Sequence, residues 1–220
     1  MHKALNRLKY LLIASHFGPT VLVVTISFAV AQLVYSPFEA LQVATAIFFG
    51  QLVVGWSNEV IDYPLDKAAG RLKKPLVSGV LKVDQLQKLI PVALILAAIV
   101  SLISPMALPG TAIHMLGILS ATFYNLKLKA TIFSPLPYII SFGGLPWAIY
   151  RGGGKTPPLW LYLALALFTT AFHFLNVLKD LQWDIEQGIL GLPQRMGRNK
   201  SLVAAAMLAV TGAILLFLQL

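Results

Sequence analysis

The chain has 220 residues, of which 58% are hydrophobic and only 11% are charged, and it contains no cysteine. A soluble domain of this length carries about 25% charged residues, so the composition indicates an integral membrane protein, and the missing cysteines exclude disulfides and thiolate metal sites. The net charge of +9 does not require a nucleic-acid partner, because Lys and Arg of membrane proteins gather in cytoplasmic loops.

Seven apolar segments approach the roughly 20 residues that a membrane-spanning helix needs. The basic N-terminal segment runs into the first of them without a small-residue cleavage site, so we expect a retained span and no signal peptide. We therefore predict an all-α fold, one transmembrane helical bundle over residues 1–220. The predicted spans are 10–34, 38–60, 86–104, 108–124, 133–150, 158–179 and 201–220.

The basic residues also predict an orientation. With the N-terminus in the cytoplasm, all but two of the 17 Lys and Arg residues fall in cytoplasmic segments, the exceptions being Arg151 and Lys155. All eight acidic residues except Glu39 then lie on the same side. We expect an integral protein of a prokaryotic cell membrane, with its charged loops at 61–85 and 180–200 in the cytoplasm.

One polar pattern occurs twice, each time where a predicted span reaches the cytoplasmic face. An Asn is followed by an Asp four residues later, and by a second Asp after four more. Residues four apart lie on one face of a helix, so each triplet is predicted to align an amide and two carboxylates. A polar helix end explains one such triplet as well as a site does, but explains two with the same spacing poorly. The triplets are Asn58, Asp62 and Asp66, and Asn176, Asp180 and Asp184.

Pro64 lies inside the first triplet and removes a backbone donor. We expect the helix to kink or end there, which leaves open whether Asp66 faces the same way as Asp62. The second triplet contains no proline, and we expect it to form an uninterrupted stripe.

Clustered carboxylates near hydrocarbon are unfavourable unless a positive charge compensates them. Ligand sets made only of oxygen favour Mg²⁺ over zinc or copper, and Mg²⁺ prefers a few carboxylates together with water and substrate phosphates. Bases beside the triplets can hold the remaining phosphate charge. The residues therefore predict a Mg²⁺–diphosphate site at the membrane.

The two triplet segments, "NEVIDYPLD" and "NVLKDLQWD", resemble the Asp-rich motifs of the UbiA superfamily of intramembrane prenyltransferases. The resemblance extends to "KKPLVSGVL", "YNLKLK" and "LPQRMGRNKS". It implies a helical bundle around a central cavity and transfer of an isoprenyl group, from an isoprenyl diphosphate bound through Mg²⁺, to a lipophilic, aromatic acceptor in the membrane, as in quinone biosynthesis. It also implies that both triplets hold the metal, with Asp62 and Asp180 as the acids most important for catalysis.

The resemblance implies a diphosphate contact from one lysine of "YNLKLK", and we also expect contacts from Lys74 and from Arg71, which stands five residues after Asp66. Family members often have Tyr-x3-Lys there, whereas Tyr124 stands three residues before Lys127 and five before Lys129, so the sequence does not choose between the two lysines. Family members typically have nine spans, which makes this chain either a C-terminally truncated or a minimal member. Its oligomeric state is not predicted.

Two other functions fit parts of the pattern. A terpene cyclase would use the same diphosphate site without an acceptor, and a cation-coupled transporter would place acids in the membrane, although none lies mid-span here. His16, in the first predicted span, is either a buried, hydrogen-bonded residue or part of the cavity. We assign no role to His114 or His173.

Overall fold

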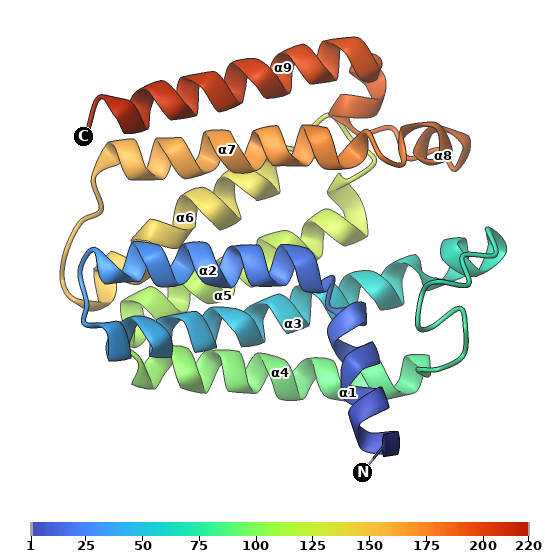
Figure 1. The fold of residues 1–220 in the computed structure, drawn as a ribbon, viewed down its shortest axis with the longest axis horizontal. Coiled ribbons are helices and arrows are strands. Elements are labelled where there is room, and N and C mark those ends of the chain that lie inside the picture. Colours follow the sequence, from blue (N-terminus) through green and yellow to red (C-terminus); the bar gives the residue numbers. More distant parts are fainter. Residues whose placement is uncertain (1, 220) are drawn as a thin grey trace. The chain divides into compact units, whose positions relative to one another are not determined.

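The computed structural model describes residues 2–219, and within that range the chain consists of helices and turns without a β-strand (Figure 1). It divides into two compact units, Met1–Thr111 and Ala112–Leu220. The predicted all-α membrane bundle is confirmed.

The first unit contains α1 (His2–Ala14), α2 (Phe17–Gln32), α3 (Pro37–Ala68) and α4 (Val83–Ile103). Helix α3 begins with a capping box, in which Ser36 and Glu39 bind each other's backbone N–H groups, and Pro37 occupies the first turn. Its small and β-branched residues are buried where α2 and α4 pack against it. Large apolar side chains on α4 point outward, as expected for a helix that faces lipid, among them Ile95, Ile99 and Ile103.

The predicted first span, 10–34, is wrong as a single helix. Helices α1 and α2 meet at a bend of 73°, because His16 adopts a left-handed backbone conformation with φ of 57° and interrupts the helical hydrogen bonds. The bend lies directly against α3 at Gly55, where a Cβ atom would approach the Ser15 carbonyl oxygen to 2.5 Å. Trp56 fixes the same contact by donating its indole N–H to the Leu11 carbonyl.

The second unit begins within α5 (Ala107–Phe123), which crosses the boundary between the units. A short π-helix, η1 (Tyr124–Leu128), continues α5 directly. It is followed by α6 (Leu136–Gly152), α7 (Leu159–Val177), α8 (Leu181–Glu186) and α9 (Leu192–Phe217). Helix α7 packs against both α6 and α9, and Ala171, Phe174 and Ala205 form the buried core between α7 and α9.

Four helices of the described chain, α3, α4, α7 and α9, are long and apolar enough to cross a membrane. The bent pair α1–α2 adds a fifth if it is taken as one span. The predicted spans 108–124 and 133–150 correspond to α5 and α6, which have 17 residues each. That length is at the lower end of the range for a membrane-spanning helix.

Candidate functional site

The first Asn–Asp–Asp triplet lies on the last turns of α3, which continues past Pro64 to Ala68. The helix therefore does not end at the proline, although Pro64 cannot donate to the Val60 carbonyl. The four-residue spacing of Asn58, Asp62 and Asp66 is helical throughout. Asp66 is only 3% exposed, so its carboxylate is turned into the protein and not towards solvent.

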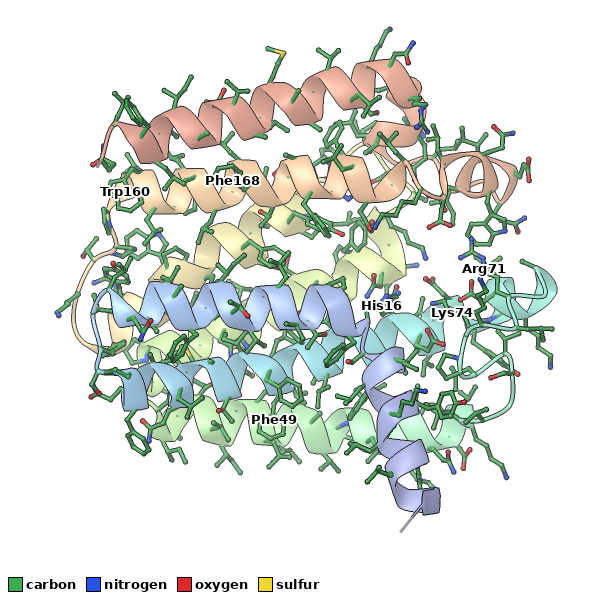
Figure 2. All side chains as sticks on the ribbon, in the orientation of Figure 1. His16, Phe49, Arg71, Lys74, Trp160 and Phe168 are labelled. Carbon is green, nitrogen blue, oxygen red and sulfur yellow. The ribbon has the colours of Figure 1, made fainter. Side chains whose placement is uncertain are left out.

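Two bases from the loop after α3 compensate this buried acid. Arg71 Nη1 lies 3.4 Å from Asp66 Oδ1, and Lys74 Nζ lies 3.5 Å from Asp66 Oδ2. Figure 2 shows both side chains beyond the C-terminal end of α3, in the part of the first unit where α3 runs into this loop. These ion pairs hold the last turn of α3 after the proline, and they place the loop bases next to the first motif as the sequence predicted.

Glu59 is an acid of this cluster that the sequence analysis did not assign. Its side chain is 2% exposed, and its Oε2 atom accepts a hydrogen bond of 2.8 Å from Lys74 Nζ. A signal was present in the sequence, because a carboxylate inside an apolar helix needs a positive partner. The partner could not be chosen, since it lies in a loop 15 residues further along.

The charge of Lys74 is stabilised by its acidic neighbours. Burial alone would lower the pKa of Lys74, but the hydrogen bond and charge of Glu59, together with the charges of Asp66 and Asp62, raise the pKa above its usual value. The ammonium group therefore stays protonated at neutral pH. It can serve as a fixed positive charge at the motif.

His16 also contacts the first motif. Its Nε2 atom lies 3.2 Å from Asn58 Nδ2, across the junction between the α1–α2 bend and α3. Since an amide nitrogen only donates, the neutral ring accepts this hydrogen bond. The Asn58 amide oxygen is then the atom that this side chain can offer to a cation. His16 is partly buried, and its hydrogen-bond partner is a residue of the first triplet, so this contact fits both interpretations of His16.

The second triplet does not form the predicted stripe. Helix α7 ends at Val177, so Asn176 lies in its last turn, Asp180 lies in a turn, and Asp184 lies in the separate helix α8. Turn hydrogen bonds from Lys179 N to the Asn176 carbonyl and from Asp180 N to the Val177 carbonyl end the helix. Asp180 has φ of −113° and ψ of 12° and precedes α8, a position that Asp often takes at the start of a helix.

Asp184 is held by a residue that the sequence analysis missed. Gln194, buried in the first turn of α9, donates from Nε2 to Asp184 Oδ2 at 2.8 Å. None of the residues of the short helix α8 is buried, so this hydrogen bond is an important tie between α8 and α9. Gln194 carries no spacing signal, because it lies ten residues after its partner, across a turn.

The π-helix bears on the choice between the two lysines of "YNLKLK". Lys129 donates its backbone N–H to the Tyr124 carbonyl at 3.0 Å, so these two residues lie one π-turn apart. In an α-helix, Tyr and Lys of the family pattern Tyr-x3-Lys are likewise one turn apart. The wider turn therefore accommodates the one extra residue before Lys129. Lys129 is also partly buried, whereas Lys127 is exposed.

His173, to which the sequence assigned no role, lies in a buried aromatic cluster of the second unit. It is 1% exposed and stacks on Tyr138 with ring centroids 4.4 Å apart. Its Nε2 atom lies 3.1 Å from Ser134 Oγ, which also accepts the N–H of Leu192 at 3.1 Å. Ser134 therefore joins α7 to the first residue of α9.

The same region leaves no space beside the backbone at Gly191. A Cβ atom there would lie 2.5 Å from the Lys129 carbonyl oxygen and 2.7 Å from Gln194 Oε1. The segment that follows η1 thus packs directly against the start of α9. This packing places Lys129 and Gln194, and through Gln194 also Asp184, in one connected part of the second unit.

The donor set fits Mg²⁺ bound together with a phosphate ligand. Among the side chains that the structure describes, those of residue 5 and residues 7–219, no group of three or more His, Asp or Glu is arranged to hold a metal ion by itself. Mg²⁺ usually takes one or two protein carboxylates and completes its shell with water and phosphate oxygens. Each triplet offers two carboxylates and one amide oxygen, which is the chemistry that such an ion needs.

Comparison with known proteins identifies the family. The model of the UbiA prenyltransferase family matches residues 18–220. The chain belongs to this family. Its apolar helices and its family membership make it an integral membrane protein. No curated protein matches.

Several solved structures share the fold of this UbiA family member. A UbiA homologue from Archaeoglobus fulgidus bound to GPP and Mg²⁺ is 15% identical with a TM-score of 0.79, covering 94% of this chain and 76% of its own. The apo homologue from Aeropyrum pernix K1 is 16% identical with a TM-score of 0.76, covering 90% and 77%. A digeranylgeranylglyceryl phosphate synthase is 22% identical with a TM-score of 0.69, covering 96% and 76%.

The Ser134 junction should matter more for stability than an ordinary helix–helix hydrogen bond. Ser134→Ala leaves the Leu192 N–H and His173 without their shared partner, at a cost of about 1–3 kcal/mol. Ser141→Ala is the matched control, because Ser141 Oγ makes one partly buried bond to the Gly117 carbonyl. Thermal unfolding of the purified protein in detergent should show the larger decrease in Tm for Ser134→Ala.

Limited proteolysis provides the second readout for this pair of variants. Cleavage between α7 and α9 should accelerate in Ser134→Ala and stay unchanged in Ser141→Ala. Equal Tm values and equal cleavage rates would contradict a joining role for Ser134.

Proposed function

We propose that this protein transfers an isoprenyl group from an isoprenyl diphosphate to a lipophilic acceptor within the membrane. The observation that carries the proposal is the doubled Asn–Asp–Asp triplet in a member of the UbiA prenyltransferase family. The ion pairs of buried Asp66 with Arg71 and Lys74 add support, because they bring acids that can bind a cation next to bases that can bind a phosphate.

Mg²⁺ is the proposed cofactor. One homologous structure is bound to GPP and Mg²⁺ and another to DMAPP and Mg²⁺. When bound, the ion would neutralise the diphosphate and stabilise it as a leaving group. The proposed ligands are the side-chain oxygens of both triplets, with Asp62 and Asp180 as the acids most needed for turnover: Asn58, Asp62, Asp66, Asn176, Asp180 and Asp184.

The protein's bases would hold the diphosphate as the bond between its oxygen and the allylic carbon breaks. We assign this role to Arg71, Lys74 and Lys129, which carry their charge next to a motif or on the π-turn after Tyr124. The acceptor then forms the new bond to the allylic carbon and loses a proton. We propose an aromatic acceptor, and an orientation with the N-terminus and both motifs in the cytoplasm of a prokaryotic cell.

The motif acids should be essential for transfer. Asp62→Asn and Asp180→Asn each remove a carboxylate charge at nearly constant volume, and we expect each to lower kcat/KM by at least about 100-fold. Asp84→Asn is the control, because Asp84 is an exposed acid in the first turn of α4, outside both triplets. The assay incubates membranes with Mg²⁺, radiolabelled isoprenyl diphosphates and a panel of acceptors, with products identified by mass spectrometry.

Three outcomes would contradict the proposal. Transfer that persists in both Asp variants would remove the motifs from the chemistry. A cyclic hydrocarbon formed without any acceptor would make the protein a terpene cyclase. Asp-dependent ion flux into vesicles without product formation would make it a transporter.

Lys129 and Lys127 should differ in their effect on diphosphate binding. Lys129→Gln should raise KM for the isoprenyl diphosphate by roughly tenfold, the loss of one charge-assisted contact. Lys127→Gln is the matched control with the same change of charge on the exposed side of η1, and its KM should stay within about twofold of the parent protein. A larger effect at Lys127 would contradict the assignment from the π-turn.

A further inference from the structure

The acid Glu59 lies outside both triplets and yet shares a base with the first of them. Lys74 Nζ is 2.8 Å from Glu59 Oε2 and 3.5 Å from Asp66 Oδ2, so one ammonium group serves two buried carboxylates at unequal distances. We infer that Glu59 is a positioning residue, whose carboxylate takes the shorter contact of the Lys74 ammonium, limits its contact with Asp66 to the longer one, and so keeps Asp66 available to a divalent cation. This inference rests on the proposed function.

Helix geometry explains why the two acids compete for one lysine. Glu59 and Asp66 are seven residues apart on a continuous helix, and a heptad returns to almost the same face, with a drift of about 20°. Both side chains are buried on that face, Glu59 at 2% and Asp66 at 3% exposure. Lys74, with its side chain 24% exposed, reaches this face from the loop after α3.

The number of positive charges close to the Asp66 carboxylate also depends on Glu59. Asp66 already has Arg71 at 3.4 Å, so a fully engaged Lys74 would give this one carboxylate two close positive charges. A cation that binds Asp66 would then have to displace the Lys74 ammonium and would be repelled by its positive charge. With Glu59 ionised, the shorter contact of Lys74 is to Glu59, and Asp66 retains only the longer one.

Glu59 is therefore expected to set metal affinity without binding metal. Neutralising it should release Lys74 onto Asp66 and weaken cation binding. Removing the lysine as well should relieve that block, because no ammonium is left to compete. A ligand role, or a purely structural role, would not produce such a recovery.

The test measures Mn²⁺ binding to the full-length protein in detergent, without substrate, by the electron paramagnetic resonance signal of free Mn²⁺. Glu59→Gln should weaken Mn²⁺ binding by roughly tenfold, since a charged competitor is transferred to the ligand. The double variant Glu59→Gln/Lys74→Gln should return to within about threefold of the parent. Thermal unfolding of each variant verifies that the protein is folded.

A charge-matched control separates position from net charge. Glu59→Gln/Lys73→Gln carries the same net charge as the first double variant, but Lys73 is an exposed neighbour in the loop. It should bind Mn²⁺ as weakly as Glu59→Gln alone. Equal recovery by both double variants would reduce the effect to general electrostatics and overturn the inference.

The remaining outcomes are also decisive. Unchanged binding in Glu59→Gln would show that Glu59 does not restrain Lys74. Weak binding in both Glu59→Gln and its Lys74→Gln double variant would leave Glu59 a ligand or structural role and overturn the inference. Failure of the parent protein to bind Mn²⁺ would overturn the proposed metal site itself. If the parent binds Mn²⁺ through Asp62 but the added Lys74→Gln substitution restores no binding, only this inference is overturned.

Discussion

Charge compensation at the end of α3 is the constraint on which the rest of the first unit depends. Two carboxylates are buried there, and their charges are compensated by Lys74, which contacts both Glu59 and Asp66, and by Arg71, which contacts Asp66. The loop after α3 must therefore fold back so that Arg71 and Lys74 reach the helix. The same contacts hold the helical turn that follows Pro64, and they create a charged site at the end of an otherwise apolar helix.

The two triplets share one sequence spacing but have different backbones. In the first unit the acids share one helix, and loop bases fix the last of them. In the second unit the chain leaves α7 after Val177, and Asp184 depends on Gln194 of α9 for its position. Close packing at Gly191 connects that arrangement to the segment carrying Lys129. A repeated sequence pattern thus does not imply a repeated local structure.

Much of the fold was predictable because apolar length and composition alone determine where a membrane protein forms helices. The bend at His16 was not, since a left-handed residue leaves no signal in hydropathy, and neither do the contacts of Ser15 with Gly55 and of Leu11 with Trp56 beside it. The four-residue spacing located both triplets, but the continuous helix that it predicted for the second one ends before Asp180, where turn hydrogen bonds replace helical ones. Glu59, Gln194 and His173 were missed because their partners are distant in sequence.

The proposed function requires that the acids of the two motifs bind divalent cations together with a diphosphate. Pulsed electron–nuclear double resonance on the purified protein with Mn²⁺ and geranyl thiolodiphosphate, an unreactive analogue, tests this directly. We predict a ³¹P coupling to protein-bound Mn²⁺ that disappears in both Asp62→Asn and Asp180→Asn and persists in Asp84→Asn. A bound Mn²⁺ without phosphorus coupling, or a coupling that survives in either motif variant, would contradict it.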